Sequence, residues 1–205
     1  NELKENPHFY KSIIAPSQWV KDLYVSKFGY PDEKISVWPV GIELPDVERS
    51  DEYDCLVYFK RRSSEELEKV VSFLESRELS YNILQYGSYT PEQVYELATK
   101  SKCCFLLNGT ESQGIAVQEI MACNTPMFVW DVTEWTDQGD QWRVPATSVP
   151  FWSSDCGERV FDSNFDETFD NFYSRIDEYN PRKYVEDNLS YKASVKTLME
   201  IFDVT

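Results

Sequence analysis

The sequence predicts an α/β fold built on a doubly wound parallel sheet, and three observations support this class. Short apolar runs alternate with amphipathic stretches between residues 55 and 130, as strands and helices do around a parallel sheet. Capping and turn residues separate these runs. The 205 residues and the 41% hydrophobic content suit one domain, or one domain with a short appendage, around a real core.

The N-terminal part of the chain forms a separate segment that ends in a linker. Ser17 is a candidate N-cap for a helix, and residues 34–40 alternate between apolar and polar as a strand does. Residues 43–54 are polar and acid-rich with one proline, which marks the best internal boundary. We therefore expect an N-terminal segment at 1–45 and the main domain at 46–205.

The alternation of strands and helices is clearest after this linker. The expected strands are residues 55–59, 81–86, 103–107 and 127–130. Helices are expected to begin at the capping box Ser63–Glu66, at Thr90-Pro91 and at Ile115. Two more helices are expected at 166–178 and 183–202. The sequence of residues 131–160 predicts neither helices nor strands. The tryptophans of this region either pack a long loop on the sheet or form a surface for sugar rings; they are Trp130, Trp135, Trp142 and Trp152.

Composition excludes several functional classes. The net charge of −16 argues against binding to nucleic acid or to an anionic membrane, because phosphate backbones are bound by clustered cations. His8 is the only histidine, so zinc sites with paired histidines and two-histidine mechanisms are excluded. The five cysteines contain no CxxC pair, and Cys103 and Cys104 lie in an apolar run. This usage, without a signal-peptide pattern, predicts buried thiols and a cytoplasmic location.

Three polar segments follow the expected strands, where ligands bind in open parallel sheets. They are Lys60-Arg61-Arg62, Gly87-Ser88-Tyr89-Thr90 and the loop 108–114, which leads into a helix. A helix N-terminus binds phosphate through its free N–H groups, and Gly114 lets the backbone approach a ligand. The three bases would neutralise a diphosphate from the opposite side. The alternative is a solvated turn.

Two carboxylates, Glu111 and Glu119, are expected at the mouth of the same crevice. Glu111 lies on the loop and Glu119 lies one turn into the following helix. A carboxylate there accepts two hydrogen bonds from a sugar or ribose diol. The spacing alone is also compatible with coincidence, because acidic residues are frequent in this chain.

The whole phrase around these carboxylates is more specific. Residues 111–126, ESQGIAVQEIMACNTP, resemble the signature of retaining GT-B glycosyltransferases of the group 1 type. That signature begins with E-x-F/Q-G and a hydrophobic residue. Three residues of any type follow, and the signature ends with EAMACGTP. Ile120 and Asn124 depart from it, and Asn124 is a mild change because asparagine tolerates the left-handed conformation. The resemblance extends to residues 13–19, 34–42 and 182–190.

The resemblance implies a Rossmann-like domain of the GT-B C-terminal type that binds a nucleoside-diphosphate sugar. Glu119 would hold the ribose hydroxyls, and Glu111 would contact the donor sugar as the catalytic carboxylate. Backbone amides would meet the sugar or phosphate at Gln113, Gly114 and Ile115. The family's basic residues after the first strand correspond to the segment with Lys60 and Arg61, which lacks the usual glycine. The base would lie near Gly87, Ser88 and Tyr89.

The implied activity is transfer of a hexosyl or deoxyhexosyl group to a glycan or another hydroxyl acceptor. No metal and no separate cofactor are expected, since cations and a helix terminus stabilise the leaving group and no D-x-D triplet is present. The acceptor half would be a removed N-terminal domain, a partner chain, or never present. The alternatives are a non-catalytic nucleotide-sugar-binding or assembly module of the same fold, and a sugar-nucleotide epimerase.

Overall fold

The main domain is built on one parallel sheet of five strands, which confirms the predicted α/β class. The computed structural model describes residues 12–136 and 143–204, so His8 and Trp142 lie outside the described residues. The strand order is β4-β3-β5-β6-β9, and every neighbouring pair is parallel. The strands are β3 (Tyr53–Lys60), β4 (Tyr81–Gln85), β5 (Ser101–Asn108), β6 (Met127–Trp130) and β9 (Gly157–Val160).

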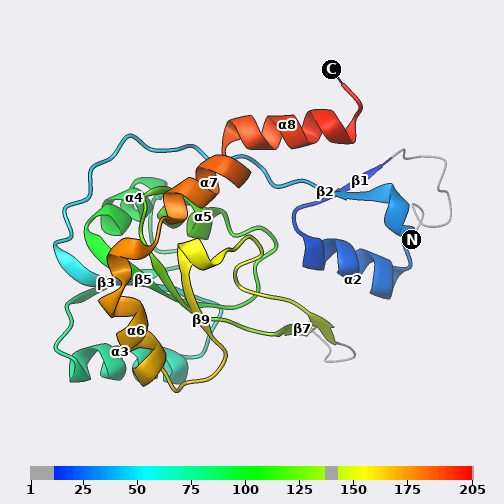
Figure 1. Cartoon of the computed structure of the whole chain (residues 1–205). Coiled ribbons are helices and arrows are strands. Elements are labelled where there is room, and N and C mark those ends of the chain that lie inside the picture. The colour runs from blue at the N-terminus through cyan, green and yellow to red at the C-terminus, as the bar shows by residue number, and fades with distance from the viewer. Residues whose placement is uncertain (1–11, 137–142, 205) are drawn as a thin grey trace.

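Helices cover both faces of this sheet (Figure 1). One face carries α3 (Ser64–Ser76) and α6 (Asp166–Ser174), and the other carries α4 (Pro91–Thr99), α5 (Ile115–Ala122) and α7 (Pro181–Asn188). Successive side chains of a strand point to opposite faces, so β3 contributes to two cores. Val57 packs with α3 and α6, whereas Leu56 packs with α4 and α5.

Local sequence signals explain where the helices begin. The capping box before α3 is present: Glu66 N–H donates to Ser63 Oγ at 3.2 Å, and Ser63 N–H donates to Glu66 Oε2 at 2.9 Å. Pro91 occupies the first turn of α4, as predicted. After α5, Asn124 adopts φ 60°, the left-handed conformation expected for the residue that stands where the family signature has glycine.

The N-terminal segment has its own small sheet and core. Strands β1 (Ile13–Ala15) and β2 (Ile35–Val37) pair in parallel, and α2 (Gln18–Phe28) with the 3₁₀ turn η1 (Asp32–Lys34) connects them. β2 is shorter than the predicted strand 34–40, because Pro39 has no N–H to continue the ladder. A cluster of Ala15, Val20, Tyr30 and Ile35 forms its core.

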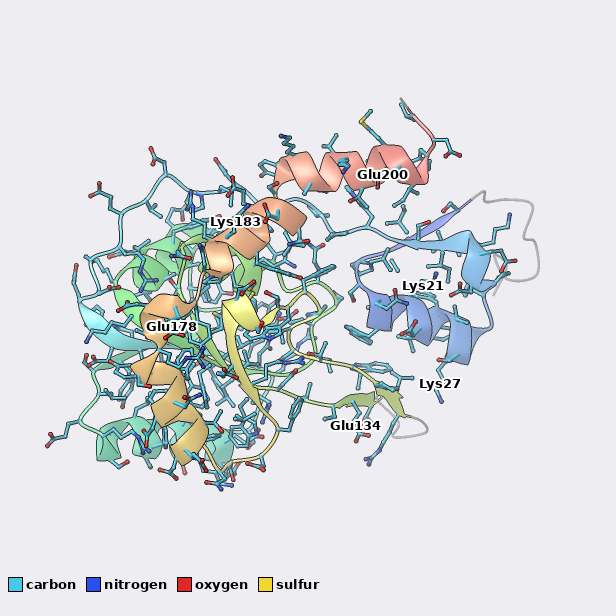
Figure 2. All side chains as sticks on the ribbon, viewed as in Figure 1. Lys21, Lys27, Glu134, Glu178, Lys183 and Glu200 are labelled. Atoms are coloured by element: carbon cyan, nitrogen blue, oxygen red, sulfur yellow. The ribbon has the colours of Figure 1, made fainter. Side chains whose placement is uncertain are left out.

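The predicted single helix 183–202 is wrong, because the structure has two helices there. α7 ends at Asn188, and α8 (Tyr191–Ile201) begins after Ser190, whose Oγ accepts the Ala193 N–H at 3.2 Å. The backbone between them pairs with the linker, where Ile42 N–H donates to the Leu189 carbonyl at 2.7 Å. Charged side chains such as Lys183 and Glu200 lie on the outer surfaces of these helices (Figure 2).

The unassigned region 131–160 contains a hairpin and the fifth strand of the sheet. The hairpin pairs β7 (Glu134–Thr136) with β8 (Arg143–Pro145), and the 3₁₀ turn η2 (Ser154–Cys156) precedes β9. Gly157 begins β9 at φ 141°, and an added Cβ would lie 1.9 Å from the Met127 carbonyl oxygen. Trp130 and Trp152 pack on the two cores, in line with the packing alternative.

All five cysteines are free and buried, which includes Cys103 and Cys104, for which burial was predicted. Burial raises the pKa of the Cys104 thiol well above its usual value and that of Cys123 to about 12. Of the helices in the described ranges, none combines the length and the apolar character that crossing a bilayer requires.

Candidate donor-binding site

A pocket of about 450 Å³ lies at the carboxyl ends of β3 and β5. The parallel register aligns Lys60 with Asn108, so the loops that follow both strands leave the sheet together. Its lining residues are Tyr58, Lys60, Tyr86, Tyr89, Pro91, Val94, Glu111, Ser112, Gln113, Gly114, Ile115, Ala116 and Glu119. The structure therefore brings together seven of the predicted site residues, which are Lys60, Tyr89, Glu111, Gln113, Gly114, Ile115 and Glu119.

An ion pair between Lys60 and Glu111 lies at the centre of this pocket. Lys60 Nζ donates to Glu111 Oε1, and each side chain is only 11% exposed. Asn108 Nδ2 donates to the same oxygen at 2.8 Å. Lys60 Nζ also lies 4.3 Å from the centre of the Tyr86 ring. These contacts keep a cation and a carboxylate at fixed positions, each ready to meet a polar ligand.

The N-terminus of α5 opens into the same pocket. Gly114 is its N-cap with φ 83°, and an added Cβ would lie 3.5 Å from Glu111 Cβ. A side chain at that position would be strained, so glycine is required by the backbone. The first N–H groups of a helix have no acceptor within the helix, and its dipole favours an anion there. The residues at this start, Gly114 to Ala116, line the pocket.

Gln113 contributes to the pocket through its backbone, because its side chain is engaged elsewhere. The Val40 N–H donates to Gln113 Oε1 at 2.9 Å, and Gln113 Nε2 donates to the Val40 carbonyl at 2.8 Å. Gln118 Nε2 donates to the Gln113 carbonyl at 3.0 Å. The sequence indicated only the backbone amide here and did not indicate the side-chain contact with the linker.

Glu119 lies half-buried at the other side of the pocket. Its Oε1 accepts a hydrogen bond from Tyr95 Oη at 3.2 Å. Burial raises the pKa of the Glu119 carboxyl above its usual value of 4.5, and the Tyr95 hydrogen bond opposes that shift. Tyr95 on α4 was not predicted as a site residue. Tyr58 is buried, and its hydroxyl pairs with Tyr89 Oη at 2.9 Å.

The three consecutive bases do not act as one cluster. Arg62 is turned away from the pocket, where it pairs with Glu66 at 2.5 Å and donates to the Trp130 carbonyl at 3.1 Å. Arg61 is exposed and does not line the pocket, although its backbone packs closely on Gly109 of the loop. Gly87 and Ser88 lie on an exposed turn outside the lining.

Asp131, directly after β6, was also missed by the sequence analysis. Its carboxylate accepts hydrogen bonds from Ser148 N–H and Oγ, both at 2.7 Å, and from Thr147 Oγ1 at 2.8 Å. Arg159 pairs with it at 3.3 Å. The Thr147 carbonyl in turn accepts the Glu111 N–H at 3.1 Å. Asp131 therefore fixes the loop that supports Glu111.

A model of a known protein family matches part of the main domain. Residues 51–137 match the family model described as glycosyl transferases group 1. This stretch, called the group 1 segment below, is similar to the group 1 glycosyl transferases. The group 1 segment includes β3 to β6 and the whole loop from Asn108 to Gly114. A comparison with curated proteins gave no match.

Solved structures show that the fold is that of GT-B glycosyltransferases. The lipopolysaccharide outer core galactosyltransferase WaaB is 12% identical with a TM-score of 0.62, over 97% of this chain and 63% of that one. A glycosyltransferase from Rickettsia africae is 12% identical with a TM-score of 0.61, over 99% and 66%. An S. aureus TarM variant, solved with fondaparinux, alpha-GlcNAc-glycerol and UDP, is 10% identical with a TM-score of 0.63, over 98% and 46%. The chain thus spans from 46% to 66% of the length of these structures.

Among the described residues, no group of three or more His, Cys, Asp or Glu side chains is arranged to hold a metal ion. The charged groups at the pocket are instead Lys60, Glu111 and Glu119, together with the terminus of α5.

Proposed function

We propose that the pocket binds a nucleoside-diphosphate sugar, and that the protein transfers a hexosyl or deoxyhexosyl group to a glycan or other hydroxyl acceptor. One observation carries the proposal: a single pocket of about 450 Å³ joins a buried cation, two carboxylates and an open helix N-terminus. The cation and the helix terminus suit a diphosphate, whose negative charge they neutralise. The carboxylates suit the sugar and ribose hydroxyls, from which they accept hydrogen bonds.

Each group has a proposed role. Lys60 and the first amides of α5, at Gln113, Gly114 and Ile115, would neutralise the diphosphate. Glu111 would contact the donor sugar, and Glu119 would accept hydrogen bonds from the ribose hydroxyls. Tyr89 lines the pocket, which supports the proposal that the base of the nucleotide binds near this residue. Three predicted site residues lie outside the pocket lining: Arg61, Gly87 and Ser88. They would contact the diphosphate or the base only if the ligand extends beyond the pocket.

The proposed chemistry releases a nucleoside diphosphate. Negative charge grows on the leaving phosphate in the transition state, where Lys60 and the α5 terminus would stabilise it. Under this proposal the protein itself supplies the positive charge, and neither a metal nor a separate cofactor takes part.

The acceptor is proposed to bind where a second domain or a partner chain meets this one. Within the described residues the N-terminal sheet has two strands, β1 and β2, and a stable sheet has more. Exposed apolar side chains line one face of α8, at Tyr191, Val195, Met199 and Phe202. Both features suit burial against further α/β structure, and we propose a cytoplasmic location for the assembly. A non-catalytic sugar-nucleotide-binding module is the second candidate, because the acceptor side is unaccounted for.

Calorimetry with UDP, GDP, TDP and ADP tests the proposal, and failure of all four to bind folded protein would refute it. Glu119→Ala should weaken binding of the active nucleotide by about 10- to 100-fold, the worth of hydrogen bonds to a charged group. Glu68→Ala is the matched control, since Glu68 is exposed on α3 at the opposite face of the sheet. Turnover of the sugar nucleotide with an acceptor separates the enzyme from the binding module, and epimerised donor formed without acceptor would indicate an epimerase.

A further inference from the structure

The indole of Trp19, in the N-terminal segment, contacts the backbone of Glu111, a residue that lines the donor pocket. Its Nε1–H donates to the backbone carbonyl of Glu111 at 2.7 Å, across 92 residues of sequence. Trp19 lies in the first turn of α2, outside the five-stranded sheet. The contact therefore links the small N-terminal sheet directly to the residue proposed to hold the donor sugar.

Every polar group of Glu111 has a partner from a different part of the chain. Its N–H donates to the Thr147 carbonyl at 3.1 Å, and its carbonyl accepts from Trp19. Its carboxylate accepts from Lys60 and Asn108. Among these hydrogen bonds of the described residues, the one from Trp19 comes from the N-terminal segment, so it links the position of that segment to Glu111.

A second contact reinforces the first. The linker residue Val40 holds the side-chain amide of Gln113 through two hydrogen bonds, at 2.8 and 2.9 Å. Gln113 lies only two residues after Glu111, so the N-terminal segment and its linker hold both ends of the short turn that precedes α5. Glu119, in contrast, is held by Tyr95 from within the main domain.

We propose that Trp19 is a positioning residue, which holds the turn 111–113 so that Glu111 meets the donor sugar. This inference rests on the proposed function. Loss of the indole hydrogen bond should free the Glu111 backbone and weaken recognition of the sugar. Recognition of the nucleotide should be weakened less, because Glu119 is held by Tyr95 and Gln113 is also held by Val40 and Gln118.

Two tryptophans make a matched experiment possible. Trp19→Phe removes the indole donor and keeps an aromatic ring in place. Trp38→Phe is the control, because Trp38 Nε1–H also donates to a backbone carbonyl, that of Ser194 at 2.9 Å, but on α8. Hydrogen–deuterium exchange of peptides covering 108–114 in the ligand-free protein measures how firmly the turn is held. Peptides from β3 and β5 report whether each variant is folded.

Exchange at 108–114 should become about fivefold faster in Trp19→Phe, the worth of one net hydrogen bond, and stay unchanged in Trp38→Phe. Calorimetry then compares UDP, GDP, TDP and ADP with their glucose conjugates. The ratio of sugar-nucleotide affinity to nucleotide affinity should fall about fivefold in Trp19→Phe only. A merely structural role would lower both affinities together and leave the ratio unchanged.

Unchanged exchange in folded Trp19→Phe would overturn the proposal, as would faster exchange with an unchanged ratio. A wild-type protein that binds none of the nucleotides would instead refute the proposed function. The exchange experiment would still decide whether Trp19 holds the turn in that case, because it needs no ligand.

Discussion

Replacing Asp131 tests how the loop after β6 is fixed to the edge of the sheet. The Asp131 side chain is 1% exposed, and its Oδ1 accepts from the backbone N–H groups of Val132 at 2.8 Å and Ser148 at 2.7 Å. Hydroxyls of Thr147 and Ser148 complete the set. Asp131→Ala removes every one of these acceptors at once.

The expected cost follows from what remains buried. A donor left without an acceptor costs about 1–3 kcal/mol, and Ser148, which is buried, would lose the acceptor for its N–H and its hydroxyl. Arg159 is 37% exposed and turns to water at little cost. We therefore expect Asp131→Ala to lower the free energy of unfolding by about 3–5 kcal/mol. Asp131→Asn keeps one acceptor oxygen and should cost about half as much, since neutral hydrogen bonds are about half as strong as charge-assisted ones.

Urea denaturation followed by circular dichroism measures these differences. Asp46→Asn serves as the control, because Asp46 is exposed on the linker, and it should change stability by less than about 0.5 kcal/mol. A loss of less than about 1 kcal/mol in Asp131→Ala would refute the reasoning, because the hydrogen bonds would then not fix the loop.

Three further results are expected. Glu119→Gln should raise the melting temperature at pH 7, because burial raises the pKa of the folded carboxyl and its ionised form costs stability; thermal scans should show the gain disappearing as the pH falls below 4.5. Gly157→Ala should cost about 3 kcal/mol or more in urea denaturation, since its Cβ meets the Met127 backbone at 1.9 Å. Lys60→Met should weaken nucleoside diphosphate binding in calorimetry by about tenfold or more and leave the binding of a nucleoside alone unchanged; equal losses for both would contradict a phosphate role.

The sequence predicted the elements that local signals specify. The capping box at Ser63, Pro91 in the first turn of α4, and Asn124 after α5 each mark a boundary that the structure confirms. The carboxyl ends of parallel strands lie at one edge by geometry, and this predicted that the segments with Lys60 and Glu111 lie at the same edge, although their ion pair was not predicted.

Features that depend on packing could not be predicted in this way. β9 has four residues, of which only the two at its ends are buried. This pattern is too short to show the alternation of apolar and polar residues that predicts a strand. The direction of Arg62 depends on Glu66 and the Trp130 carbonyl rather than on its neighbours in sequence. Tyr95 and Trp19 enter the site from helices that sit far from the loop in sequence, and no local pattern marks such contacts.

The buried thiols make the native protein resistant to alkylation. Thiol reagents attack the thiolate; burial shields all five sulfurs, and it raises the pKa of the Cys104 thiol. Cys55 and Cys103 face each other on the central strands β3 and β5, so a reagent reaches them only when the sheet separates. The rate at which these two residues are labelled then measures the rate of global opening, with no probe added to the chain.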